Sequence, residues 1–360
     1  MKIRERYIAK ILLSYTLVVL VVWLGIYSFF NFLTEINFVG QESYTILSAI
    51  KYIILKIPEV TYSQASPVIL LGCVLGMGHL ATTNQLLIFR VSGASILKIT
   101  AITLKNALIF VIVIITIGEF LAPMSSNFAE LGRSNALGNK VLSTSQEGFW
   151  IRDGGNFINV KNNIDGKLFS EITVIEVNSL NKIERVIKSE NAVFDGNSLD
   201  MSGTEIFSIS NEGFFDNISL KEHNSYNKTV SFDQDLIDSL EKEPKDLTTW
   251  TIIKQIQFLS DNKLRSVVFE VELYKRLVKP ITLIAMILLA MLFIFGSTRD
   301  VTLGRKIFLG VALGLSFEML SRIASAMSLS FDLNPLMSAT LPSTIVMLIS
   351  ITLLIQKSMS

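Results

Sequence analysis

Side chains that perform chemistry are sparse in this sequence. Its two histidines, His79 and His223, are far apart, and neither stands in a catalytic triad or an HExxH arrangement. The sequence contains no GxxxxGKS or GxxxxGKT nucleotide-binding loop. Its single cysteine, Cys73, lies in an apolar run, which predicts a buried, inert thiol rather than a disulfide or a zinc ligand. We therefore predict no catalytic residues, no metal and no cofactor, and an energy source in a partner or an ion gradient.

One charged pair stands inside an apolar window. Glu318 precedes Arg322 by four residues, the favourable spacing for an ion pair on a helix. Such a pair lowers the cost of placing two charges in lipid, so one interpretation is structural. The other is that Arg322, in the outer half of the bilayer, binds an anionic lipid headgroup. A proton relay is disfavoured because no second acid lies nearby, and Glu119 precedes Pro123 at the expected end of a helix.

The elements that hold these residues are predicted to be membrane helices. The 360 residues are 50% hydrophobic and 18% charged, whereas soluble domains average about 25% charged residues. A helix that crosses a bilayer needs about 20 mostly apolar residues, and six windows qualify. They are residues 11–33, 60–81, 99–121, 277–297, 307–328 and 336–356. The first is too long for a signal-peptide core and lacks a small-residue cleavage site, so we expect it to be a permanent span.

The distribution of basic residues orients these six spans. An even number of spans places both termini on one side of the membrane. The ends and loops on that side carry ten basic residues, whereas the short loops on the other side carry only Lys51 and Lys56. The ten are Lys2, Arg4, Arg6, Lys10, Arg90, Lys98, Arg299, Arg305, Lys306 and Lys357. By the positive-inside rule, both termini are predicted to be cytoplasmic and residues 123–262 to lie outside the cytoplasm.

The central segment, residues 123–262, has a different composition. It holds 21 acidic and 13 basic residues and consists of short alternating runs separated by turn sequences. The runs are Asn156–Val160, Phe169–Val177, Glu184–Ile187, Ile206–Ile209, Phe214–Leu220 and Thr229–Phe232. The turns are Asp153-Gly154-Gly155, Asp165-Gly166, Asp195-Gly196 and Glu212-Gly213. This pattern predicts an antiparallel β-sandwich or β-jellyroll, followed by a helix at Asp246–Leu259 that leads back to the membrane.

The predicted fold is therefore an α+β membrane protein with three regions. Residues 1–122 hold three spans, residues 123–262 the inserted β-jellyroll domain, and residues 263–360 the other three spans. Residues 44–57 are amphipathic and are expected to lie at the outer membrane interface. Spans 2 and 5 have small-residue faces that favour a partner helix bundle, formed by Gly72 with Gly76 and by Gly310 with Gly314.

The cytoplasmic loop at about residues 82–98 is too apolar for a solvated linker. Arg90 stands there among five large apolar side chains, and Ser92-Gly93 is a helix stop signal. The five are Leu86, Leu87, Ile88, Phe89 and Val91. We predict a short helix that buries this face either against the bilayer or in the groove of a partner protein.

Motifs along the whole chain resemble one family, the LptF/LptG permeases, which export lipopolysaccharide from the inner membrane of Gram-negative bacteria. The order of three spans, a β-jellyroll and three spans is similar. The N-terminal motifs are Arg6-Tyr7, Gly72 to Gly78, Val91-Ser92-Gly93 and Gly118-Glu119 with Ala122-Pro123. The later ones are Leu142-Ser143-Thr144, Gly148, Trp150, Arg152-Asp153-Gly154, Asn156-Phe157, Phe293 to Gly296 and Arg299. The stretch around Trp150 is closer to the LptG branch than to the LptF branch.

The resemblance implies a multi-pass subunit of an ABC transporter in the inner membrane, with its β-domain in the periplasm. Its partners would be LptF in a heterodimer, two copies of the ATPase LptB, and LptC, with no nucleic acid. Lipopolysaccharide would enter between spans 1 and 5 of the two permeases and move into the β-jellyrolls. ATP hydrolysis would reside in LptB. A membrane sensor is the alternative from another class, and it is disfavoured because no cytoplasmic signalling domain is present.

The resemblance also implies roles for individual residues, with two departures. Contacts with the ATPase would come from Gln85, Leu86, Phe89, Arg90 and Gly93. Relatives often have an acidic residue where this chain has Gln85. Relatives also often have lysines near the outer end of span 1, where this chain has Asn31 and Glu35. Lipid phosphates would then be bound by Lys51, Lys56 or Arg322, with Glu318 beside Arg322, or the charge would be supplied by LptF.

Overall fold

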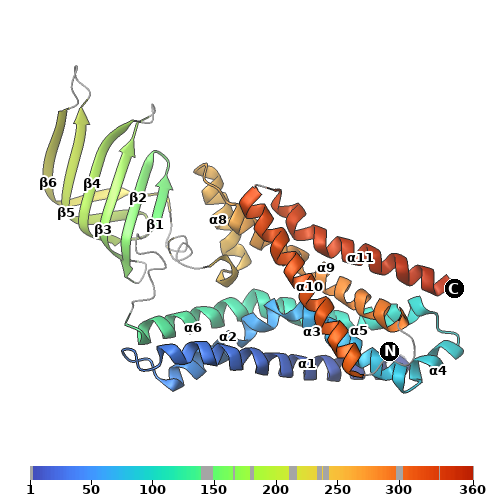
Figure 1. Cartoon of the computed structure of the whole chain (residues 1–360). Coiled ribbons are helices and arrows are strands. Elements are labelled where there is room, and N and C mark those ends of the chain that lie inside the picture. The colour runs from blue at the N-terminus through green and yellow to red at the C-terminus, as the bar shows by residue number, and fades with distance from the viewer. Residues whose placement is uncertain are drawn as a thin grey trace. The chain divides into compact units, whose positions relative to one another are not determined.

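The computed structural model divides the chain into a helical unit and a sheet unit (Figure 1). It describes residues 3–138, 149–164, 167–178, 182–210, 217–232, 237, 243–296, 303–331 and 333–359. The helical unit comprises Met1–Ala136 and Val267–Ser360, and the sheet unit comprises Leu137–Ser266. The first boundary lies beyond residue 122, because helix α6 (Ala122–Ala136) continues the third span without a break in helical backbone.

The predicted membrane spans are present as helices. In the described part of the chain, six helical segments are long and apolar enough to cross a membrane. They contain α1 (Ile3–Glu35), α3 (Ala65–Thr82), α5 (Ile96–Thr116) with α6, α9 (Val267–Gly296), α10 (Leu303–Phe331) and α11 (Pro335–Met359). Within an 18-residue window, α3 is 78% buried inside the unit, whereas α1 and α10 are 22% and 17% buried. Helix α3 is therefore central, and α1 and α10 are peripheral.

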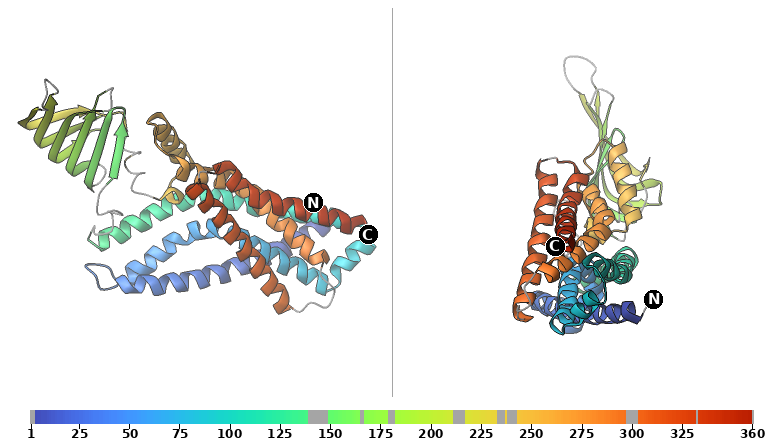
Figure 2. Two further views of the ribbon diagram at one scale, coloured as in Figure 1. Left: turned by 45° about the horizontal axis from the view of Figure 1, so that its top comes forward. Right: turned by 90° about the vertical axis from the view of Figure 1, so that its right-hand side faces the viewer.

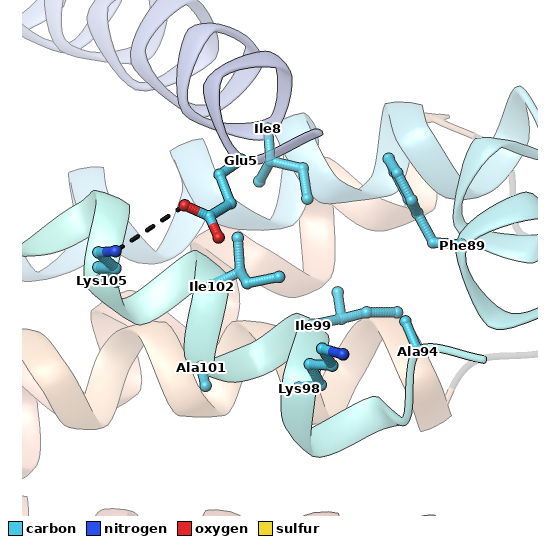
Figure 3. Close-up of a pocket in the computed structure, with 9 residues that line it drawn as sticks. All are labelled: Glu5, Ile8, Phe89, Ala94, Lys98, Ile99, Ala101, Ile102 and Lys105. Carbon is cyan, nitrogen blue, oxygen red and sulfur yellow. Dashed lines mark ion pairs between the residues drawn. The ribbon is translucent and has the colours of Figure 1, made fainter. Parts of the chain in front are cut away.

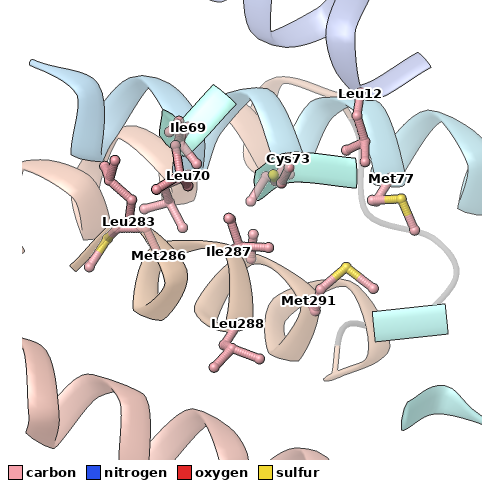
Figure 4. Close-up of a cluster of buried hydrophobic side chains, with 14 of the residues drawn as sticks. Leu12, Ile69, Leu70, Cys73, Met77, Leu283, Met286, Ile287, Leu288 and Met291 are labelled. Carbon is pink, nitrogen blue, oxygen red and sulfur yellow. The ribbon is translucent and has the colours of Figure 1, made fainter. Parts of the chain in front are cut away.

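The core of the helical unit lies between α3 and α9. Figure 4 shows Ile69, Cys73 and Met77 of α3 facing Ile287 and Met291 of α9. Cys73 is 2% exposed, which confirms the predicted buried thiol. Because lipid tails are as apolar as these side chains, the helices gain from close van der Waals packing rather than from escape from water.

The glycine faces pack against helices of the same chain rather than of a partner bundle. A methyl group at Gly72 would lie 2.5 Å from Oγ1 and 2.7 Å from Cα of Thr16 on α1. At Gly76 the nearest atom would be 3.5 Å away, which is an ordinary contact. Gly310 and Gly314 of α10 face α3, where added methyl groups would approach Leu71 and Pro67 within 2.8 and 2.9 Å. The smooth faces thus bring α1 and α10 against α3.

The amphipathic segment before the second span is helix α2 (Ile46–Ser63). It starts with a capping box in which Thr45 and Ser48 bind each other's backbone N–H groups. One face buries Ala49, Ile53 and Val60, and α2 packs along α6 (Figures 1 and 2). The other face remains apolar and exposed. Gln64 then separates α2 from α3.

The described residues of the sheet unit form six antiparallel strands in consecutive order, which confirms the antiparallel prediction. They are β1 (Phe149–Asp153), β2 (Asn156–Ile164), β3 (Leu168–Val177), β4 (Ile183–Phe194), β5 (Ser198–Ser210) and β6 (Asn217–Thr229). The predicted turns at Gly154 and Gly196 are present, with φ of +58° and +106°. Those at residues 165–166 and 212–213 lie outside the described residues. Residues 229–232 are not a separate strand, since Thr229 ends β6.

The sheet is creased along a line that crosses five strands. At this line the pairing skips one position in each strand, so that Val160 and Asn162 pair with β3 while Lys161 does not. The skipped positions are Lys161, Glu171, Glu190, Gly203 and Asn224. The inward-facing positions change parity there, from Ile172 to Phe169 on β3. Both halves therefore line one core, which Phe258 of helix α8 (Thr249–Asp261) also contacts.

We predict that Gly72→Ala lowers the stability of the helical unit more than Gly76→Ala. The methyl group at residue 72 meets the backbone of α1, and such overpacking costs about 1–3 kcal/mol. At residue 76 there is room, and replacing glycine within a helix gains about 0.5–1 kcal/mol. The temperature at which each purified variant loses its gel-filtration peak measures the difference. Equal midpoints for the two variants would contradict the packing described for α1 and α3.

Candidate functional site

The loop between the second and third spans contains helix α4 (Gln85–Val91), as predicted. It follows Asn84, whose φ is +58°, and it ends at Gly93, whose φ is +84°. The Gly93 N–H donates to the Arg90 carbonyl at 3.0 Å, and the Ala94 N–H donates to the Phe89 carbonyl at 3.1 Å. A left-handed glycine of this kind is a common end of a helix. The Ser92-Gly93 stop signal is therefore confirmed.

The apolar side chains of α4 divide between two faces. Leu86 is 5% exposed, and both Leu86 and Phe89 pack into the core of the helical unit. Ile88 and Val91 point outward and are 66% and 82% exposed, with Leu87 beside them at 40%. The outward face consists of Leu87, Ile88 and Val91, which belong to the predicted apolar face of the loop but not to the ATPase contacts implied by the resemblance. The i, i+3 spacing of Ile88 and Val91 could have predicted this second face, since it is the same as the spacing of Leu86 and Phe89.

The other three candidates on this loop have different environments. Arg90 and Gly93 are both exposed. The Oε1 atom of Gln85 is buried and has no hydrogen-bond partner in the described part of the chain. Leu86 and Phe89 therefore hold α4 against the unit, while Leu87, Ile88 and Val91 form its free surface.

Glu35, a candidate lipid contact, belongs to a polar cluster at the other end of the helical unit. The Arg133 Nε lies 3.0 Å from Glu35 Oε2, and the Tyr44 hydroxyl donates to the same oxygen at 2.7 Å. The Arg133 guanidinium also stacks 4.6 Å from the Phe38 ring centroid. Glu35 is only 6% exposed. Its carboxylate therefore joins the end of α1 to α6.

Lys56, a second candidate, is held in the same way. Its Nζ lies 3.0 Å from Glu59 and 3.1 Å from Glu130. Ser126 donates to Glu59 at 3.1 Å, and the Tyr52 hydroxyl donates to Glu130 at 3.0 Å. The Lys56 side chain is 11% exposed. Lys56 therefore joins α2 to α6 instead of facing lipid.

The tyrosine hydroxyls of these two groups of ion pairs, Tyr44 beside Glu35 and Tyr52 beside Glu130, stay protonated. Burial raises the pKa of Tyr44 above its ordinary value, and the neighbouring Glu35 carboxylate adds to the effect. Burial together with Glu130 raises the pKa of Tyr52 in the same direction. Both hydroxyls therefore remain hydrogen-bond donors to carboxylates.

Two cationic candidates remain accessible. Lys51 on α2 is exposed and has no ion pair within the described ranges, and Asn31 on α1 is half-buried. The Arg322 Nε lies 3.1 Å from Glu318 Oε1, which confirms the predicted ion pair on α10. The Arg322 side chain is 70% exposed and that of Glu318 is 24% exposed. Arg322 is therefore paired on one side and free to bind an anion with its terminal amino groups.

A polar contact that we did not predict lies where α2 gives way to α3. The Nζ of Lys279 donates to the Ser63 carbonyl at 3.2 Å and lies 5.1 Å from the centre of the Tyr62 ring. The Tyr62 ring also lies against Gly118, in a π-helical segment (Ile117–Leu121). A methyl group added at Gly118 would overlap the ring. The Gly118-Glu119 motif thus accommodates Tyr62. The missed signal was a lysine inside the fourth apolar window.

Comparison with known proteins gives a consistent result along the chain. The family described as lipopolysaccharide export system permease LptF/LptG matches residues 6–356. The lipopolysaccharide export system permease protein LptG of Escherichia coli (strain K12) is 25% identical over 360 residues, 98% of each chain. The protein of the same name from Haemophilus influenzae is 26% identical over 340 residues, 94% of each chain. This chain belongs to the LptF/LptG family of lipopolysaccharide export permeases.

Proposed function

We propose that this chain is a permease subunit of an ABC transporter that extracts lipopolysaccharide from the inner membrane. The family match over residues 6–356 carries the proposal. The relatives named above are LptG proteins, so LptF is the expected partner in the heterodimer rather than the identity of this chain. Two LptB subunits would supply ATP hydrolysis, and LptC would receive the lipid. Residues 123–262 would lie in the periplasm and both termini in the cytoplasm.

The distribution of charge supports this orientation. Both chain ends and α4 lie at one end of the helical unit, and the paired helices α2 and α6, which the Lys56 ion pairs join, lie toward the other (Figure 1). The first end carries exposed Arg6, Lys10 and Lys98, whereas the lysine at position 56 near the other end is neutralised by two carboxylates. Basic residues are retained on the cytoplasmic side of membrane proteins.

The outward face of α4 is the proposed docking surface for LptB. Full burial of one large aliphatic side chain contributes about 1.5–3 kcal/mol, so Leu87, Ile88 and Val91 can supply a substantial part of an interface. The anchored face of α4 would carry the motion of the ATPase into the helical unit. The alternative for the same surface is that it rests on the bilayer.

Helices α1 and α10 are the proposed walls of the lipid entrance. Each has one face against α3 and another that exposes large apolar side chains, such as Val21 on α1 and Met319 on α10. Acyl chains would lie against these faces, and Arg322 would bind a phosphate. In the sheet unit, β1 and β6 are the edges of the described sheet, and such edges can extend into a partner's sheet.

We predict that Ile88→Asp separates the permease from LptB while leaving its pairing with LptF intact. A charge on the outward face opposes burial in a protein groove, and the substitution leaves the inner face of α4 unchanged. Co-purification of tagged LptB with the permease pair measures the effect. Substitution of Phe89 together with Arg90 is less specific, because Phe89 packs inward.

Met359→Asp is the matched control, since Met359 is 79% exposed and also lies at the end that we assign to the cytoplasm. It should leave LptB bound. Retention of LptB by the Ile88→Asp protein would assign the surface to the bilayer instead.

We predict that Arg322→Gln reduces the lipopolysaccharide that co-purifies with the transporter. Loss of a hydrogen bond to a charged group costs about 1.5–3 kcal/mol, which corresponds to roughly 10- to 100-fold weaker binding. Lys56→Gln should instead lower thermal stability, because it breaks contacts between α2 and α6, and should leave bound lipid unchanged. Unchanged lipid in the Arg322 variant would restrict Arg322 to its structural pairing with Glu318.

A further inference from the structure

A cavity of about 230 Å³ opens at the end of the helical unit that carries both termini (Figure 3). It lies between α1, α4 and α5. Ile8 of α1, Phe89 of α4 and Ile99 of α5 form apolar walls, and Lys98 and Lys105 of α5 stand at the rim. Its walls therefore suit a hydrocarbon group, and its rim suits an anion.

The rim keeps one cation available. Lys105 Nζ lies 3.8 Å from Glu5 Oε2, a loose pair in which the lysine side chain is 66% exposed. Lys98 is exposed, and the described residues provide it with no ion pair. Its backbone N–H binds the Ser95 side chain at 3.2 Å, which fixes the start of α5. The rim therefore has one positive charge in excess.

Beyond the cavity, the same face of α5 carries exposed apolar side chains. Lys98, Ala101, Lys105, Leu108 and Ile112 follow one another at steps of three or four residues, so they share one face of the helix. Leu108 and Ile112 are 42% and 63% exposed. With a rise of 1.5 Å per residue, they lie about 5 and 10 Å beyond Lys105, within the ~15 Å depth of one leaflet.

We propose that this groove binds an anionic phospholipid of the inner leaflet. Its phosphate would bind Lys98 and Lys105, and an acyl chain would lie along Ala101, Leu108 and Ile112. The exposed apolar side chains that follow the cavity on α5, at the depth of the acyl chains, favour a lipid over a soluble protein, which cannot reach that depth. Because Phe89 forms one wall, a bound lipid would also support α4 from the side opposite its outward face. The site is distinct from the lipopolysaccharide path of the proposed function.

The test uses the full-length chain purified with its partner subunits in detergent. Native mass spectrometry after addition of phosphatidylglycerol or phosphatidylcholine reports retained lipid. The wild-type complex should retain phosphatidylglycerol in preference to phosphatidylcholine. The Lys98→Gln, Lys105→Gln double variant should bind it about 30-fold more weakly, because each basic residue near a membrane surface contributes a factor of about five.

Three further variants separate charge, shape and background. Glu5→Gln should increase phosphatidylglycerol retention, because Lys105 loses its competing carboxylate. Ala101→Trp should decrease retention with all charges present, because the indole fills the apolar part of the groove. Lys10→Gln, at an exposed lysine on α1 that does not line the cavity, should behave like the wild type.

Two results would overturn the proposal. One is equal retention of the two lipids by the wild-type complex. The other is unchanged phosphatidylglycerol in the double lysine variant; if LptB were lost at the same time, the groove would belong to a protein interface. Both results are independent of whether the complex moves lipopolysaccharide, since neither measurement requires transport.

Discussion

The close approach of α1 and α10 to α3 is the constraint on which the helical unit depends. Gly72 lets the backbone of α1 approach α3, and Gly310 and Gly314 let α10 approach α3 from another side. Helix α3 also forms the core with α9 and continues through Asn84 into α4. We infer that a displacement of α4 reaches the two peripheral helices through one shared neighbour. A rigid, glycine-lined helix suits this task because close-packed contacts transmit displacement rather than absorb it.

The pairing of charges determines which residues remain available for ligands. Glu35 and Lys56 were both candidate lipid contacts, yet both are paired with charged groups on α2 or α6 and are largely buried. Arg322 and Lys51 keep exposed cationic groups. An exposed cation can exchange water for a lipid phosphate, whereas a buried paired cation would first have to break its ion pairs, leaving buried carboxylates unpaired. Arg322 and Lys51 are therefore better candidates for binding a lipid phosphate than Glu35 and Lys56.

The spans and the antiparallel strands could be predicted because each follows from a repeating pattern. Bilayer thickness sets the length of an apolar helix, and a half-buried strand alternates with period two. The pairing of Glu35 with Arg133 was out of reach, since the two residues are 98 positions apart and only the packing of α6 brings them together. The inward face of α4 was ambiguous because both of its apolar pairs have helical spacing. The contact of Lys279 could have been anticipated, because a lysine inside an apolar window requires a polar partner.

The crease explains why a sequence that suggested a two-layered β-domain forms a single sheet among the described strands. The positive φ values of Glu171 and Gly203, +54° and +63°, occur on the skipped line, where the inward-facing parity changes. Read as separate runs, the residues on either side resemble strands of two facing sheets. In the structure they are halves of the same long strands that face a common core. A continuous strand across the crease keeps its neighbours on both halves, so the described strands line one core from both halves of a single sheet. Of the two edge strands, β6 extends along both halves of the sheet and β1 along one half. Pairing of another β-domain with β6 would therefore continue the same crease.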